Sequence, residues 1–118
     1  MKLLTKEIEN KLPKLYSNDE KNTPTLDQVV VARFFNPVGP GTWWAIEGQP
    51  CGDDFTFYGI AHITTDADFG YFSLNELQSL ELPLGMGIER DICFSPTRLG
   101  DIFELKEFCK IFDKEVLC

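Results

Sequence analysis

The sequence predicts an α+β domain, a mostly antiparallel sheet of four to five strands packed against two to three helices. Two observations lead to this fold class. Segments between residues 28 and 94 are rich in Val, Ile, Phe, Trp and Tyr, several alternate in polarity, and Pro- and Gly-bearing turns separate them. Before, within and after these segments, helix-capping residues precede apolar residues at helical spacing.

The first helix is expected over Lys6–Leu12, with Thr5 as its N-cap and Pro13 ending or kinking it. The polar residues 17–25 that follow predict a flexible loop.

Five strands are expected, joined by turns in which Pro, Gly and Asp recur. They are Gln28–Phe35, Thr42–Glu47, Phe55–Ile63, Phe69–Phe72 and Ile88–Phe94. The residues between the second and third strands, Gly48–Asp54, are expected to form a loop.

Two further helices complete the fold. Ser73 and Glu76 form a capping box for one of them. Asp101 with Glu104 resembles a second cap, and an amphipathic C-terminal helix is expected to pack on its own sheet or on a partner. Its apolar positions are Leu105, Phe108, Cys109, Phe112 and Val116.

The length, 118 residues and 13.4 kDa, fits one domain over residues 1–118. A hydrophobic content of 43% with 25% charged residues excludes a disordered chain. The domain divides into an N-terminal helix and loop (1–24), an acidic sheet core with one helix (25–96) and the C-terminal helix (97–118).

The net charge is −8, and residues 25–96 account for all of it, with Arg33 and Arg90 against ten acidic residues. Such a surface repels phosphate backbones, so direct binding of nucleic acid or of an anionic membrane is not expected. Either the acids form a solvated face, or they face a basic protein partner, including one that normally holds DNA.

Four cysteines, Cys51, Cys93, Cys109 and Cys118, lack metal-ligand spacing, and no signal-peptide core is seen. We expect reduced, mostly buried thiols and a cytoplasmic location, with no metal and no cofactor. The single histidine, His62, lies within a strand pattern and has no recognisable nucleophile motif beside it. No catalytic residue is therefore predicted.

The Trp43–Trp44 pair is the most informative local feature, because two neighbouring strand residues point to opposite faces. Either one ring is exposed beside Glu47, which alternation places on the side of Trp43, or both faces are covered and both rings are core. In the first case Trp43 is an aromatic binding anchor. The acidic field around it would include Glu47, Asp53, Asp54, Asp66, Asp68 and Glu89.

Several motifs, in this order, resemble an uncharacterised bacterial family, domain of unknown function 2958. They are Leu3-Leu4-Thr5-Lys6-Glu7-Ile8 with Leu12-Pro13 and Leu15-Tyr16, Arg33-Phe34-Phe35-Asn36-Pro37, Trp43-Trp44 with Glu47, Asp54 with Phe57-Tyr58-Gly59, Gly70-Tyr71-Phe72-Ser73-Leu74 with Glu76-Leu77, and Ile88-Glu89-Arg90-Asp91 with Phe94 and Pro96. The resemblance covers roughly residues 3–100, and the tail beyond looks like an extension.

The resemblance implies an accessory protein of plasmids, conjugative elements or phages, and no catalytic residue. The first functional hypothesis is therefore a small acidic, non-enzymatic protein-binding domain of a mobile element. It would inhibit a host defence complex (anti-restriction or anti-CRISPR) by DNA mimicry. The alternative is a structural or regulatory module of plasmid transfer or maintenance. The hypothesis favoured least is an enzyme that uses carboxylates such as Asp54 and Glu89.

Overall fold

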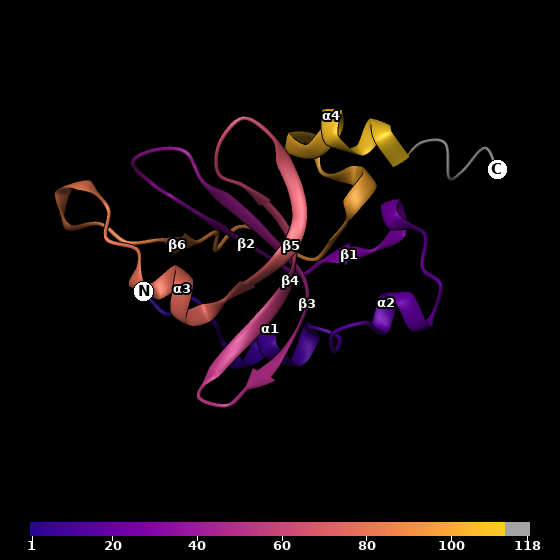
Figure 1. The fold of residues 1–118 in the computed structure, drawn as a ribbon, viewed down its shortest axis with the longest axis horizontal. Helices are drawn as coiled ribbons and strands as arrows, with labels where there is room; N and C mark the ends of the chain where they lie inside the picture. Colours follow the sequence, from indigo (N-terminus) through magenta and orange to yellow (C-terminus); the bar gives the residue numbers. More distant parts are fainter. Residues whose placement is uncertain (113–118) are drawn as a thin grey trace.

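A five-stranded antiparallel sheet, in the order β5-β4-β3-β2-β6, forms the centre of the molecule (Figure 1). The structure, a computed structural model, describes residues 1–112. The strands of this sheet are β2 (Ala32–Phe35), β3 (Thr42–Cys51), β4 (Asp54–His62), β5 (Ala67–Ser73) and β6 (Glu89–Arg90). A separate two-stranded sheet joins β1 (Val29–Val30) to β7 (Thr97–Arg98). The predicted fold class is confirmed.

Short helices lie around the sheet. The α-helices are α1 (Lys6–Lys11), α2 (Ser17–Glu20), α3 (Leu74–Ser79) and α4 (Lys106–Cys109). The 3₁₀ turns are Thr25–Asp27, Pro83–Gly85, Leu99–Asp101, Phe103–Leu105 and Lys110–Phe112.

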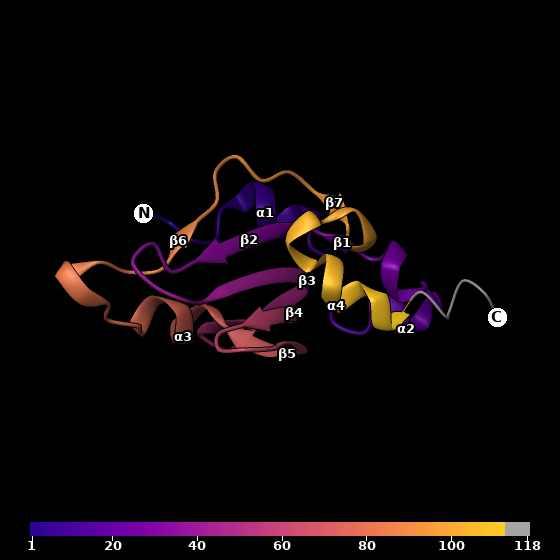
Figure 2. The same ribbon diagram turned by 90° about the horizontal axis from the view of Figure 1, so that it is seen from above.

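Each face of the sheet carries its own hydrophobic core. On one face Phe34, Trp43 and Phe57 pack with residues of α1 and α3 and with the segments that flank these helices. On the other face Trp44 and Ile60 pack against the segment that runs from Leu99 to α4. In Figure 2, α1 lies next to β2, whereas α4 lies beside β3 and β4 toward the right of the view. Both faces of the sheet are therefore covered, so the side chains of both Trp43 and Trp44 are buried.

The predicted helix caps at Thr5 and Ser73 are confirmed. Thr5 Oγ1 accepts a hydrogen bond from the Ile8 amide at 3.2 Å, and Ser73 Oγ accepts one from the Glu76 amide at 3.1 Å. Both caps depend on residues three positions apart, so local sequence is enough to place them.

Two of the predicted strands are divided or shortened in the structure. The segment Gln28–Phe35 divides, because β1 pairs with β7 while β2 pairs with β3. The segment 88–94 keeps only Glu89–Arg90 as strand, because Asp91 Oδ1 accepts from the Cys93 amide and turns the chain.

The predicted loop Gly48–Asp54 is mostly strand. β3 continues to Cys51 and pairs with β4 up to the Cys51–Asp54 pair. A tight turn makes this possible, since Gly52 takes a φ of +59°, a conformation that glycine adopts without steric cost.

The polar segment 17–25 was expected to be a loop but contains α2. The C-terminal helix is also different. Residues 99–112 form a series of short turns around α4, and Asp101 pairs with Arg98 instead of capping a helix. The predicted apolar position Val116 and the cysteine Cys118 lie outside the described residues.

The expectation of mostly buried thiols was wrong for Cys51 and Cys93, which are exposed, while Cys109 is buried. Within residues 1–112 no helix is both long and apolar enough to cross a membrane.

Candidate binding site

Both tryptophans are core residues. Trp43 is 6% exposed and Trp44 is 1% exposed, on opposite faces of the sheet. The interpretation of Trp43 as an exposed aromatic anchor was therefore wrong, because elements cover both faces.

Glu47 lies on the face of Trp44, not on the face of Trp43 as simple alternation predicted. Ala45 pairs with Gly59 and Glu47 pairs with Tyr58, so Ile46 is an extra residue in β3. Such a β-bulge reverses the alternation of every side chain that follows it. Glu47 consequently points to the side where α2 lies.

The Glu47 carboxylate is the one acidic side chain buried among residues 1–112, with 4% of the residue exposed. Its Oε1 accepts from the Tyr16 amide at 2.8 Å, and its Oε2 accepts from the Asn18 amide at 2.9 Å and from Asn18 Nδ2 at 2.7 Å. Tyr16 precedes α2 with a left-handed φ of 71° and provides no side-chain cap of its own. Glu47 therefore caps a helix that lies about thirty residues away along the chain.

All three tyrosines of the chain gather next to this carboxylate. Tyr58 is the cross-strand partner of Glu47, and Tyr71 is the cross-strand partner of Tyr58. Ring centroids are 5.2 Å apart for Tyr58–Tyr71 and 6.5 Å apart for Tyr16–Tyr71. Together with Asn18, Asp19, Gln28 and Glu47, the rings line a hollow of about 100 Å³.

The phenols of Tyr58 and Tyr71 are held neutral. A hydrogen bond with the Tyr16 side chain is the main reason why the pKa of Tyr71 rises to about 12. Burial raises the pKa of Tyr58, and the negative charges of Asp19 and Glu47 raise it further. The two carboxylates thus act on the same phenol, and the hollow is negatively charged and walled by aromatic rings.

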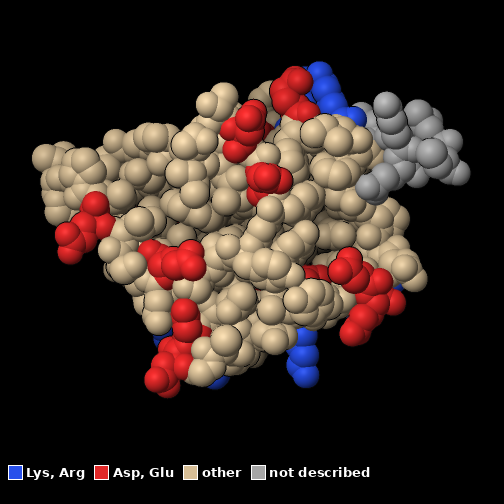
Figure 3. Space-filling model, in the orientation of Figure 1, with Lys and Arg blue, Asp and Glu red and all other residues tan. Residues whose placement is uncertain are grey.

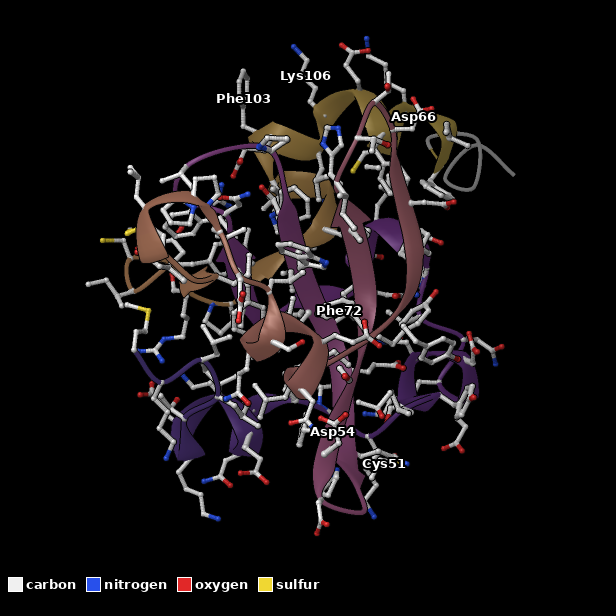
Figure 4. The ribbon with its side chains drawn as sticks, turned by 60° about the vertical axis from the view of Figure 1, so that its left-hand side comes forward. Cys51, Asp54, Asp66, Phe72, Phe103 and Lys106 are labelled. Atoms are coloured by element: carbon white, nitrogen blue, oxygen red, sulfur yellow. The ribbon has the colours of Figure 1, made fainter. Side chains whose placement is uncertain are left out.

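The acids predicted from the sequence do not converge on one site. Asp53 and Asp54 lie at the β3–β4 turn, whereas Asp66 and Asp68 lie beyond the other end of β4. Figure 4 shows Asp54 and Asp66 far apart. At about 3.3 Å per residue, the eight steps along β4 separate these two groups by about 26 Å. On the face of the molecule seen in Figure 3, the acidic side chains accordingly form separate groups.

Asp54 has a local structural role. Its Oδ1 accepts from the Asn75 amide at 3.0 Å and from the Phe55 amide at 2.7 Å, and these hydrogen bonds lower the pKa of its carboxyl group. Asp68 similarly accepts from the Phe69 amide at 2.9 Å.

Glu89 lies on the β6 edge, opposite Phe35, at the end of the sheet away from Asp54. The two carboxylates suggested for an enzyme are therefore too far apart for a glycosidase-like pair, whose separation is at most about 10 Å. Among residues 1–112, no group of three or more His, Cys, Asp or Glu residues is placed to hold a metal ion.

The sequence reasoning found Glu47 but missed its neighbours Tyr16, Tyr58 and Tyr71. Each of these tyrosines lies in one of the motifs that carry the family resemblance, and that membership was the signal that could have marked them.

Comparison with known proteins gives one match. The family model described as Protein of unknown function (DUF2958) matches residues 3–107. The match extends beyond residue 100, so part of the tail that looked like an extension lies within the family. No curated protein and no solved structure matches. Because the family model covers most of the chain, this protein belongs to the DUF2958 family.

Proposed function

We propose that this chain is an acidic, non-enzymatic protein-binding domain that engages a basic protein in the bacterial cytoplasm. In its most specific form, the proposal is that it inhibits a DNA-handling host defence complex of a restriction or CRISPR system. The observation that carries the proposal is the set of acids in residues 25–96 that have no cationic partner.

The two arginines of this segment are occupied inside the molecule. Arg33 contacts Asp91 at 3.4 Å and Glu104 at 2.8 Å, and Arg90 donates to the carbonyl of Lys2. Within residues 1–112, by contrast, the acids Asp53, Asp66 and Glu89 form no ion pair. The segment therefore presents uncompensated carboxylates to a partner.

The spacing of the acids supports an extended contact. The groups at the two ends of β4 are about 26 Å apart, a distance that corresponds to roughly eight base pairs of DNA. A partner that holds DNA along a basic groove could contact both groups at once. The family resemblance adds the setting of a mobile element, in which such inhibition is useful to the element.

The test is affinity capture from a lysate of a bacterium rich in restriction and CRISPR systems, with elution by a salt gradient. A basic DNA-handling complex that elutes at moderate salt, and that DNA displaces, supports the proposal. Asp53→Lys and Asp66→Lys reverse charge at the two ends of β4, and both are expected to weaken capture. Glu9→Lys is the control, because it changes the net charge equally outside residues 25–96. Unchanged capture by both β4-end variants would refute the proposal.

A second candidate is an accessory module of plasmid transfer or maintenance. Three apolar side chains favour it, namely Leu84, Ile92 and Phe103, which are 90%, 72% and 83% exposed. Exposed apolar residues support contacts that salt does not weaken. Capture of a partner that persists at high salt, and that Phe103→Ala or Leu84→Ala abolishes, would favour this candidate over inhibition.

A further inference from the structure

The tyrosine-lined hollow carries negative charge that the protein does not neutralise. Glu47 is buried and Asp19 lies beside it, yet no Lys or Arg within residues 1–112 forms an ion pair with either carboxylate. A buried carboxylate ordinarily has a cation, a metal or a full set of hydrogen bonds. The hydrogen bonds to Glu47 come from amide groups, which solvate the charge without cancelling it.

One acceptor position of Glu47 is left over. An ionised carboxylate offers about four such positions on its two oxygens. Oε2 accepts two hydrogen bonds, from the amide and the side chain of Asn18, whereas Oε1 accepts one, from the Tyr16 amide. A further N–H donor in the hollow would therefore find a charged acceptor.

The aromatic walls favour a cationic donor. Tyr16 and Tyr71 are each a little more than half exposed, with tilted rings at the edge of the hollow. Aromatic faces attract a cation that lies within about 6 Å of the ring. The raised pKa values of Tyr58 and Tyr71 keep these two phenols neutral at physiological pH, so they add no competing charge.

The size of the hollow limits its occupant to a single head group. Its volume of about 100 Å³ is well below the roughly 300–1,000 Å³ of pockets for drug-sized molecules. A guanidinium group is planar, carries five N–H donors, stacks on aromatic rings and is more weakly hydrated than an ammonium. It matches a narrow site that has one charged acceptor and several ring faces.

We propose that the hollow formed by Tyr16, Glu47, Tyr58 and Tyr71 receives the guanidinium of an arginine side chain from a protein partner. This inference rests on the proposed function, because it takes a basic protein as the partner. It adds the point of attachment, where one arginine is buried between the tyrosines.

The test uses the full chain, labelled with ¹⁵N, and titrates it with N-acetyl-arginine amide at constant ionic strength. N-acetyl-citrulline amide, the neutral analogue of nearly the same shape, is the matched probe. The arginine probe is expected to shift the amide signals of Tyr16 and Asn18 progressively, and the citrulline probe to leave them in place.

Two variants locate the binding. Glu47→Gln is expected to abolish the shifts, and Tyr71→Ala to weaken binding by roughly two- to fivefold, the contribution of an exposed cation–π contact. Tyr71→Phe, which keeps the ring, is expected to bind like the wild type. Since Glu47 also caps α2, its variant is first checked for a folded amide spectrum. If it is unfolded, the Tyr71 pair decides, because that side chain is half exposed.

Equal shifts with citrulline, or no shifts with arginine, would overturn the inference. Equal binding of N-acetyl-lysine amide would overturn the choice of guanidinium. The two proposals fail separately. A captured basic partner whose affinity is unchanged in Glu47→Gln and Tyr71→Ala leaves the function standing and removes this site. Arginine binding in the hollow without capture of any basic partner leaves this site standing and removes the proposed function.

Discussion

Replacing Gly59 by alanine is expected to destabilise the sheet at the point that orients Glu47. A Cβ atom at Gly59 would lie 1.9 Å from the carbonyl oxygen of Trp44 and 3.2 Å from the Cα of Ala45. Both are backbone atoms, so no rotamer change can relieve the overlap. The Ile46 bulge follows directly, and a shift of β3 here would therefore displace Glu47 as well.

The cost can be estimated from packing data. Overpacking in a core costs about 1–3 kcal/mol and sometimes more, and a clash with backbone belongs at the upper end. We expect Gly59→Ala to lower the free energy of unfolding by about 3 kcal/mol. With about 2.1 cal/mol/K of unfolding entropy per residue, this corresponds to a Tm lower by roughly 12 °C.

Gly70→Ala is the matched control. Gly70 is the cross-strand partner of Gly59, but a Cβ at this position has no atom within 4 Å. The variant is expected to be neutral or to gain up to about 1 kcal/mol, since alanine restricts the unfolded chain. Urea unfolding is followed by the fluorescence of the two buried tryptophans. Equal midpoints for the two alanine variants would refute the reasoning.

Three further predictions concern titration and reactivity. Hydrogen bonds lower the pKa of Asp54, so Asp54→Asn is expected to be less stable than the wild type at about pH 7. The difference in stability should shrink as the pH falls through the lowered pKa of Asp54. Urea unfolding midpoints of the two proteins at about pH 7 and pH 3 measure it. The pKa of Tyr71 is raised to about 12. The stability that the neutral Tyr71 phenol contributes is therefore complete below about pH 10 and is lost as the pH rises through about 12. Ultraviolet titration should therefore show that the wild type and Tyr71→Phe form the same amount of tyrosinate up to about pH 11, and a difference at lower pH would contradict it. Cys51 and Cys93 should react with a thiol reagent in the native protein, and Cys109 only after unfolding, as peptide mass spectrometry can verify.

The features that the sequence predicted correctly are those determined by residues close together in the chain. The caps at Thr5 and Ser73 and the alternation of Thr42 to Ala45 depend on residues a few positions apart, and all three were predicted correctly. The fold class follows from the same patterns, since their order limits the ways in which the chain can cover a sheet.

The site depends on contacts that sequence patterns do not carry. The direction of Glu47 is set by the Ile46 bulge, and the bulge requires pairing with a strand that holds Gly59. The helix α2 is capped from a strand about thirty residues away, so its own segment looks like a polar loop. Asp101 does not cap a helix, because its carboxylate forms an ion pair with Arg98.

The pairing of β1 with β7 has a consequence for the order of folding. β2 to β5 follow one another as hairpins, so their contacts close short loops. The β1–β7 pair instead joins segments that are roughly 70 residues apart, and such closure carries a larger entropic cost. The meander can therefore form first, with the segment from Thr97 onward docking over Trp44 last. In the native protein the β1–β7 pair should open before the five-stranded sheet does, and amide exchange should be faster in β7 than in β3 and β4.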